Sequence, residues 1–507
     1  MRTKDSAQPM ARITEVKVEE GQLQLCGEFA FTCSLPQQDA RLPEQLEAAI
    51  EAGGQEIKRQ LFQASLERAE MDLLLTGRQG KNGQGFQRRG YKPYSFKAVF
   101  GTVSMRRQQV QQKADGSVVL PSAQAWQTPD RMCITPGLRA AVCDGMLEQS
   151  VRQTARRVAA AAGEENLLCA TECLKIVHGE GTALQAAQQQ RAAAVLAADP
   201  AAQRQLLPAA VDGPTVDAGE TPCAADLALA DDGANEPAVA TLAPLGFPGA
   251  AAAEAVDQDQ PRQVDPGMVL VQADEVKVHA QPSTGQREIL VYTAVVLAAC
   301  QRWCVTAASS TALIEQVAGL LAHLGVHRGQ RSLLFLADGA RWIRNWFDQL
   351  DVPAKAMILC WYHLVKKCQQ QLSMACKGRK HREEIQAEVL GHLWEGRVAE
   401  ALAVLQARRR EMRTALALDQ LVEYITRRRA YLPNYKSRQQ AGLWIASNRV
   451  EKFNDWAVSE RCKHQGMAWT PEGVNALAAM EAARRNGDLK PWRQTQTLPA
   501  WTECKAA

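Results

Sequence analysis

Residues 268–280 read MVLVQADEVKVHA, residues 287–300 read REILVYTAVVLAAC, and residues 302–308 read RWCVTAA. All three stretches are rich in β-branched residues and bounded by polar or turn-forming positions, so we expect three strands in close succession. A helical stretch, SSTALIEQVAGLLAHLG, comes next. Two buried-type strands follow, RSLLFLAD (331–338) and AKAMILC (354–360), and a helical pattern succeeds each of them. The predicted element order is therefore β-β-β-α-β-α-β-α.

This order is typical of a ribonuclease H-like α/β core, a mixed sheet flanked by helices in which the first and fourth strands lie side by side. Asp274 lies on the first strand and Asp338 at the end of the fourth. The predicted sheet brings the two carboxylates together although 63 residues separate them. An aspartate after a strand is common and usually structural. The agreement of both positions with the strand order favours a functional pair.

The chain before this core divides by composition. Residues from Leu42 to about Gly77 have a helical pattern, and a basic, glycine-rich loop follows from Arg78 to Arg89. Residues 95–121 alternate as a β-hairpin does, and we predict its turn at Ala114-Asp115-Gly116. Residues 150–181 give the outline of a helix-turn-helix around Gly163. An ordinary helical hairpin has the same pattern, and Arg152, Arg156 and Arg157 are the residues that favour DNA binding.

Charge is distributed unevenly along the 507 residues. The net charge is +4, but the stretch from Gly181 to Arg262 alone carries −8, which leaves +12 on the rest. The excess of basic residues outside this stretch suits binding to a polyanion such as DNA. Lys and Arg that neutralise phosphates release the counterions condensed on the nucleic acid, and this release favours binding. The first part of the stretch from Gly181 to Arg262 is compatible with a helix, but residues from Pro200 onward are acidic and low in complexity, and we interpret them as a flexible linker or insertion.

These patterns predict six regions, in keeping with a length that suggests two to four domains. The core is interrupted by a basic, helical stretch, so the fold class is an α/β core with an all-α insertion, preceded by an α+β region. The regions are an N-terminal α+β region (1–134), a helix-turn-helix-like region (135–182), a linker or insertion (183–265), the first part of the core (266–375), a helical insertion (376–441) and a C-terminal core helix with a tail (442–507).

Composition excludes several classes of protein. Apolar residues make up 46% and charged residues 22%, which excludes a wholly disordered, collagenous or small disulfide-stapled chain. The first 20 residues have no apolar core for a signal peptide, and the longest apolar run, residues 289–300, is too short for a bilayer. The fourteen cysteines form no CxxC pair. Free thiols in a reducing cytoplasm are therefore expected.

Two-metal phosphoryl chemistry needs several carboxylates around ions roughly 4 Å apart. Besides Asp274 and Asp338, a third carboxylate must come from a late helix, and Glu451 is the best candidate. Asp455, one turn later, is a reserve ligand or a solvated charge. Glu275 should point away from Asp274 on a regular strand and is excluded.

Cys360 and His363 suggest a zinc site, with Cys368 and Cys376 at regular spacing. A structural zinc ion needs four ligands, and no second pair stands out. We therefore favour a polar or DNA-contacting role near the active centre for His363. Cysteines 169, 173, 300 and 304 are interpreted as core residues. The basic residues closest to Glu451 are the expected phosphate contacts, namely Arg449, Lys452, Arg461 and Lys463.

Four stretches of the chain resemble bacterial insertion-sequence transposases of the DDE type, in the Kra- and Lre-type families related to Mutator-like transposases. They are QADEVKV around Asp274, LADGARWI around Asp338, ILCWYHLVKK, and SNRVEKFNDWAVSERCKHQGMAWTPEGVNAL. In the third, Cys360 and His363 match the Cys/Asp-x-x-His signature of these families. The fourth resembles an ending built around a Val-Glu pair and a later Gly-Met-x-Trp. The N-terminal FKAVFGTVSMRRQQV and the helix-turn-helix outline also look like the upstream part of such proteins.

The resemblance implies that Asp274, Asp338 and Glu451 bind two Mg²⁺ or Mn²⁺ ions, with Cys360 and His363 as auxiliary active-site residues. It further implies that the chain binds double-stranded DNA at element ends and targets, as a homo-oligomer near the bacterial nucleoid. These families usually have a Gly-Ser-Gly-like run before the Val-Glu pair, where this chain has Ala446-Ser447-Asn448. The difference leaves open a catalytically inactive or domesticated DNA-binding relative. A nuclease that cuts without joining is the third alternative.

Overall fold

The computed structural model describes residues 10–19, 22–30, 42–78, 86–112, 115–126, 132–208, 264–463 and 466–502. The chain forms two compact units, residues 1–180 and 181–507, and the boundary between them falls within the residues of helix α5 (Ala170–Ala198). Within the described ranges, no helix combines the length and apolarity that crossing a membrane requires.

The first unit contains two sheets and a long helix. Strands β1 (Met10–Glu19) and β2 (Gln22–Ala30) pair antiparallel. A second sheet has the order β5-β4-β3-β6 and contains β3 (Phe86–Ala98), β4 (Gly101–Gln112), β5 (Val118–Val119) and β6 (Met132–Ile134). Helix α1 (Leu42–Arg78) confirms the predicted helix and packs Phe62 and Leu66 against Tyr94 and Phe96 of β3. The short helix α2 (Pro121–Ala125) follows β5.

The hairpin of the first unit differs from its prediction. Ala98 pairs with Gly101, so the main turn lies at Val99-Phe100, where Gly101 takes a φ of +112°. The predicted turn at Asp115-Gly116 instead joins β4 to β5, closed by a bond from Gln112 N–H to the Ser117 carbonyl. Strand β1–β2 pairing was not predicted at all.

Two short helices complete the first unit before α5. Helix α3 (Pro136–Glu148) begins after Thr135, whose side-chain oxygen accepts the Leu138 N–H, as an N-cap does. Helix α4 (Val151–Ala162) begins with a capping box between Ser150 and Gln153 and ends at Gly163, which has a φ of +66°. Residues 163–169 separate α4 from α5, more than the turn of a helix-turn-helix allows. The tight connection lies instead between α3 and α4.

The second unit is built on a five-stranded mixed sheet of order β11-β10-β7-β8-β9. Its first three strands are antiparallel neighbours, namely β7 (Met268–His279), β8 (Glu288–Ala298) and β9 (Gln301–Ala307). Strands β10 (Ser332–Ala337) and β11 (Lys355–Leu359) run parallel to β7. The predicted strand set is confirmed, and so is the adjacency of its first and fourth members.

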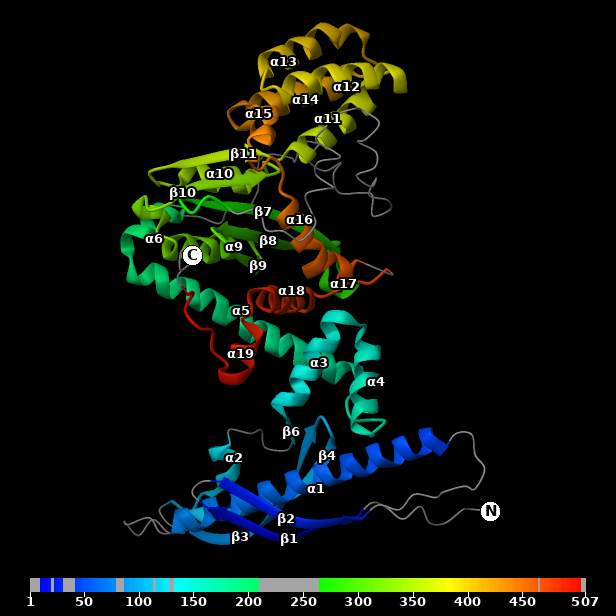
Figure 1. Ribbon diagram of the computed structural model, residues 1–507, viewed down its shortest axis with the longest axis vertical. Helices are drawn as coiled ribbons and strands as arrows, with labels where there is room; N and C mark the ends of the chain where they lie inside the picture. The colour runs from blue at the N-terminus through cyan, green and yellow to red at the C-terminus, as the bar shows by residue number, and fades with distance from the viewer. Residues whose placement is uncertain are drawn as a thin grey trace. The chain divides into compact units, whose positions relative to one another are not determined.

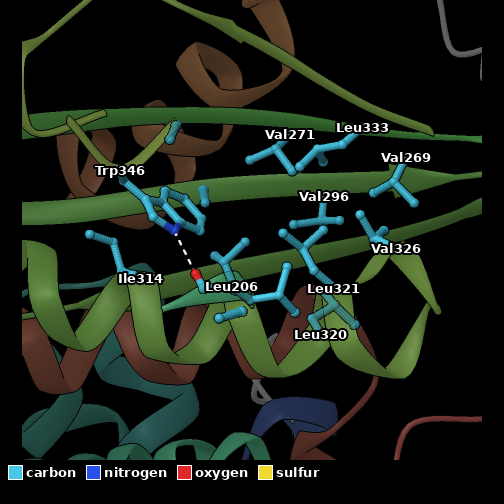
Figure 2. Close-up of a cluster of buried hydrophobic side chains, with 14 of the residues drawn as sticks. Leu206, Val269, Val271, Val296, Ile314, Leu320, Leu321, Val326, Leu333 and Trp346 are labelled. Carbon is cyan, nitrogen blue, oxygen red and sulfur yellow. Dashed lines mark hydrogen bonds between the residues drawn. The ribbon is translucent and has the colours of Figure 1, made fainter. Parts of the chain in front are cut away.

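One face of this sheet carries the main hydrophobic core. Helices α9 (Ser310–His323) and α10 (Arg341–Gln349) cover it, and Val269 and Val271 of β7 face them. Figure 2 shows the cluster, in which Trp346 Nε1 donates to the Leu206 carbonyl at 2.9 Å. Because side chains alternate along a strand, Gln272 and Asp274 of β7 face the opposite side.

Helices surround the rest of the sheet. After α11 (Trp361–Ala375), the residues predicted to be helical form a group of helices, which lies beyond the β11 edge of the sheet (Figure 1). It contains α12 (Arg379–Trp394), α13 (Val398–Ala407), α14 (Ala415–Arg427) and α15 (Tyr435–Gln440). The chain then returns to the second face of the sheet through α16 (Asn448–Asn454), a π-helical turn (Asp455–Ser459), α17 (Glu460–Cys462), α18 (Pro471–Asn486) and α19 (Leu489–Thr495).

The predicted linker begins too early. Helix α5 continues to Ala198 and α6 (Pro200–Leu206) follows, with Leu196, Ala202 and Leu206 buried in the core. The part that the sequence left compatible with a helix is helical, and helix extends past Pro200 to Leu206. The small side chains of α5 allow a close helix contact, as between Ala192 and Gly319. The rest of the predicted linker, residues 209–263, lies outside the described residues.

The close contact between Gly319 of α9 and Ala192 of α5 predicts an effect of substitution on stability. A Cβ there would lie 2.7 Å from both the Cα and Cβ of Ala192 on α5. We expect Gly319→Ala to lower the free energy of unfolding by about 1–3 kcal/mol, because the two helices must separate. Gly391→Ala is the control, since its Cβ would meet no atom within 4 Å in helix α12 and alanine favours helix. Equal chemical-denaturation midpoints for wild type and Gly319→Ala would contradict the prediction.

A pH dependence is expected at Asp199, which caps α6. Its carboxylate accepts hydrogen bonds from Arg328 Nη2 at 2.6 Å, from His327 Nε2 at 2.9 Å and from the backbone of Ala201 and Ala202. The Arg328 bond, the Ala202 amide and His327 hold the pKa of Asp199 well below its usual range. A lowered carboxyl pKa stabilises the fold above the unfolded pKa of about 4, and the contribution declines as the pH falls below it.

Asp199→Asn should therefore lower the melting temperature at pH 7. The deficit should shrink as the pH is lowered from about 4 towards 2, because the unfolded wild type takes up a proton at Asp199 over this range and the folded state loses the advantage of its ionised carboxylate. Thermal unfolding of both proteins across this range is the measurement. A deficit that stays constant down to pH 2 would show that the charge of Asp199 is not its cause.

Candidate active site

Asp274 is held in place from two sides. Its Oδ1 accepts the Glu275 backbone N–H at 2.8 Å, and its Oδ2 accepts Asn454 Nδ2 at 2.7 Å. The amide oxygen of Asn454 in turn accepts the hydroxyl of Thr293 at 2.6 Å, and Thr293 is the residue that pairs with Asp274 across β7 and β8. This chain of bonds orients one Asp274 oxygen towards α16.

Asp338 follows β10 directly. Its Oδ1 accepts the Ala340 N–H at 2.8 Å, which fixes the turn into α10. The intervening Gly339 has a φ of +80°, and a Cβ there would lie 2.9 Å from Leu359 Cδ1 and Arg428 Nε. The turn that presents Asp338 therefore requires glycine. Arg428, at the end of α14, donates to the Gly339 carbonyl at 3.1 Å, so the insertion contacts this turn.

Glu451 lies in the first turn of α16, and its position relative to β7 is fixed by Gln272. The Gln272 Oε1 accepts the backbone N–H groups of Arg449 and Val450 at 3.0 and 3.1 Å. Ser447 precedes the helix and donates its hydroxyl to Glu451 Oε1 at 3.0 Å. Gln272 therefore holds the N-terminus of α16 against strand β7, two residues before Asp274.

The three carboxylates interact electrostatically. Burial raises the pKa of Asp274 to about 7, and Asp338 and Glu451 contribute to the rise, while His363 and the Glu275 amide oppose it. The charges of Asp338 and Glu451 add to the effect of burial because like charges near a carboxylate disfavour its ionised form. Residues from β7, the end of β10 and α16 thus share one electrostatic environment. Binding of metal by the three remains a prediction.

Glu275 was excluded as a ligand, and the structure gives it another partner. Its Oε2 accepts the indole N–H of Trp342 at 3.1 Å. Burial and the charge of Asp338 raise the pKa of Glu275. The reserve candidate Asp455 lies in the π-helical turn, and the neighbouring Asn454 is the residue that bonds to Asp274.

Cys360 and His363 lie beside Glu451. One ligand atom from each of the three residues lies within 4.8 Å of the other two, and in the described part of the chain no other three His, Cys, Asp or Glu residues gather so closely. His363 Nδ1 is 3.8 Å from Glu451 Oε1. Burial lowers the pKa of His363, but Cys360, Asp338 and Glu451 outweigh it and raise the pKa to about 10.

The replacement of glycine before Glu451 causes no backbone strain. Apart from glycines, only Ala299 and Gln496 have a positive φ in the described residues. Ala446, Ser447 and Asn448 are therefore in conformations that any residue adopts. Ser447, at the position of the serine in that run, donates its hydroxyl to Glu451.

Comparison with models of known protein families gives no match. No curated protein matches the chain either. The family resemblance therefore stands on the motifs alone.

The predicted phosphate contacts next to Glu451 divide into two groups. Arg461 is buried, with its guanidinium 5.0 Å from the Trp469 ring, and burial lowers its pKa. This packing argues against a phosphate contact by Arg461 and explains Trp469 as a core residue. Arg449 and Lys452 are half-buried, over Trp444 and Trp456, and Lys463 is exposed.

In the first unit, the three predicted DNA-binding arginines are all exposed on α4. Arg157 forms an ion pair with Glu148 at 3.6 Å. Arg88 and Arg89, predicted in a loop, belong to strand β3.

The cysteines predicted to be core residues also divide. The structure records Cys173 and Cys304 as buried but Cys169 and Cys300 as exposed, so the last two are corrected. None of the described cysteines forms a disulfide.

Four polar residues that shape the site were missed, namely Gln272, Thr293, Ser447 and Asn454. A signal existed for two of them. Gln272 lies two residues before Asp274 and shares its strand face, and Asn454 lies three residues after Glu451 on the same helix face. Thr293 and Ser447 required the strand register and the path of the loop, which sequence spacing does not supply.

Proposed function

We propose that this chain is a DNA transposase of a bacterial insertion sequence, which cleaves and joins DNA strands at a divalent-metal site formed by Asp274, Asp338 and Glu451. The observation that carries the proposal is geometric: Asp274 and Asp338 lie on, and directly after, the adjacent strands β7 and β10, and Asn454, on the helix that bears Glu451, donates to Asp274 Oδ2 at 2.7 Å. Such a gathering of carboxylates is unfavourable unless protons or cations compensate it. A cation-binding role explains why the fold retains it.

The sheet supports the same proposal. Its order, β11-β10-β7-β8-β9, with β10 parallel to β7, is the arrangement expected of a ribonuclease H-like core. The proposed first and second aspartates lie on, or directly after, the two adjacent strands. Glu451 comes from a helix that packs on β7 and β8.

The available donors suit Mg²⁺ or Mn²⁺, which prefer carboxylate oxygens. Each carboxylate accepts one or two hydrogen bonds that orient it, and carboxylate oxygens offer about four lone-pair sites. When bound, two such ions polarise the scissile phosphate and activate first water and then a 3′-hydroxyl. The protein's own part is to hold Asp274 through Asn454, Asp338 through the Ala340 amide, and Glu451 through Ser447.

The first unit is proposed to bind the element ends. Arg152, Arg156 and Arg157 are exposed along α4, the second helix of the tight α3–α4 pair. In DNA-binding helix pairs the second helix enters the major groove. The exposed arginines then neutralise phosphates on either side of it. Assembly as a homo-oligomer on DNA belongs to the same proposal.

The test is incubation of the purified full-length chain with duplexes that carry the sequences flanking its gene. We expect nicking at the element ends with Mg²⁺ or Mn²⁺, followed by joining to target DNA, and neither reaction with EDTA. Nicking without joining would support a nuclease instead. Tight, sequence-specific binding with no nicking under either metal would support the inactive or domesticated DNA-binding alternative.

A further inference from the structure

A second set of metal ligands adjoins the carboxylates. It consists of a thiol, an imidazole and a carboxylate, from Cys360, His363 and Glu451. Cys360 and His363 lie at the start of α11, and Glu451 lies in the first turn of α16. Ser447, which precedes α16, is 87 positions after Cys360, so the fold brings together two distant parts of the chain. The sequence pattern gave only the Cys360–His363 pair, and the third donor is supplied by the fold.

The geometry is close to that of a bound ion. Around tetrahedral zinc, with Zn–S of about 2.3 Å and Zn–N and Zn–O of about 2.0–2.2 Å, neighbouring ligand atoms lie about 3.5 Å apart. The three donor atoms here lie within 4.8 Å of one another, and His363 Nδ1 is 3.8 Å from Glu451 Oε1. Side-chain rotations that move the donor atoms by about one ångström would bring them to the separations found around zinc.

The surroundings also suit a metal-bound thiolate. The Ser447 backbone N–H points at Cys360 Sγ, at 3.3 Å, while the Ser447 hydroxyl donates to Glu451 Oε1. One residue therefore orients two of the three donors, as outer-shell partners of metal ligands do. His363 Nδ1 is buried and has no hydrogen-bond partner in the described structure, although an imidazole nitrogen normally requires one.

We infer that Cys360, His363 and Glu451 form a site for one thiophilic divalent ion of the Zn²⁺ class, distinct in its donors from the aspartate pair. Sulfur and imidazole donors select zinc and cobalt over magnesium. Three protein ligands leave a fourth position for water. Binding replaces the thiol proton of Cys360 and any proton on the ligating His363 nitrogen, and these protons pass to solvent. The thiolate and the carboxylate together neutralise the ion's charge.

A metal-free thiolate–imidazolium pair that acts as a nucleophile is the alternative for these residues. The Cys360 side chain is completely buried, so a substrate cannot reach its sulfur. Burial presents no obstacle to a metal ion, because structural ions are enclosed by their ligands.

The proposed ion would share Glu451 with the catalytic carboxylates, and this part of the inference rests on the proposed function. Binding at one set then alters the affinity of the other, because both use the same carboxylate. The existence of the thiophilic site does not depend on any DNA chemistry.

The experiment is titration of the full-length, metal-free protein with Co²⁺, followed by optical absorption. A thiolate ligand gives a near-ultraviolet charge-transfer band, and tetrahedral cobalt gives visible bands. We expect both to saturate at one ion per chain and to disappear on addition of Zn²⁺, which binds more tightly than Co²⁺. Cys360→Ser should abolish the charge-transfer band. His363→Ala should weaken Co²⁺ binding by at least about a hundredfold.

Cys368→Ser is the matched control, since Cys368 is also completely buried on α11 but lies outside the ligand set. It should keep both bands. Asp274→Asn should keep them too, because Asp274 is not a member of the set, and circular dichroism verifies the fold of each variant. No charge-transfer band in the wild type, or a band that survives Cys360→Ser, would overturn the inference. A wild type with the band but no DNA cleavage would refute only the proposed function.

Discussion

Asp338→Asn is expected to reduce metal-dependent nicking and joining by at least about a thousandfold. The substitution keeps the size of the side chain, and its amide oxygen can still accept the Ala340 N–H that shapes the turn. It removes one negative charge from the cation site, so Mg²⁺ affinity should decrease. Binding to DNA ends should persist or tighten, because repulsion between the protein and phosphate decreases.

The same result is expected for Asp274→Asn and Glu451→Gln, and double substitutions should add little, since the carboxylates act as a unit. Asp348→Asn is the matched control. Asp348 is exposed on α10, where it accepts the Tyr431 hydroxyl, and its loss should leave nicking unchanged. The measurement is initial nicking rate at several Mg²⁺ concentrations. Undiminished nicking by Asp338→Asn would exclude the assigned triad.

Replacing Arg152, Arg156 and Arg157 together with alanine is expected to weaken DNA binding roughly a hundredfold, at about 1 kcal/mol for each phosphate contact. The slope of log affinity against log salt should fall by about three, since each lost contact removes about 0.9. All three side chains are exposed on α4, so the fold should be unaffected. Fluorescence anisotropy over a range of salt concentrations measures both quantities.

A second triple variant controls for total charge. Arg379, Arg409 and Arg427 are exposed on or near the helical insertion, and each forms an ion pair, with Glu383, Asp419 and Glu423 respectively. Their replacement with alanine removes the same three charges from residues that acidic neighbours already neutralise. A similar loss of affinity in both triple variants would show that net charge, and not α4, determines binding.

Strand prediction succeeded where burial on both faces produced continuous apolar runs. Residues 331–338 and 354–360 are of this kind, and β10 and β11 lie there. The β1–β2 hairpin was missed although its strands are long, because polar and apolar residues alternate along them and no continuous apolar run identifies them. The hairpin turn was misplaced because Asp115-Gly116 has strong turn chemistry, whereas Val99-Phe100 has none.

Sequence spacing identified some residues of the candidate site but not others. Asp274 and Asp338 could be paired from the strand order, because neighbouring strands of a known topology fix which ends meet. Glu451, the third member of the Cys360–His363 group, could not be assigned from spacing. Its position depends on where α16 packs on the sheet after the helical insertion. Arg461 looked equivalent to Lys463 in the sequence, yet one is buried against Trp469 and the other is exposed.

The position of α5 in the chain has a consequence for co-translational folding. Its second half lies against α18, where Gln185 donates to the Asn475 carbonyl and Arg191 pairs with Asp488 at 2.9 Å. About 290 residues separate these partners along the chain. During translation the apolar side of α5 leaves the ribosome long before α18 exists to cover it. The contact between α5 and α18 therefore forms only after residues 471–486 have been synthesised, and until then the side of α5 that faces α18 stays uncovered.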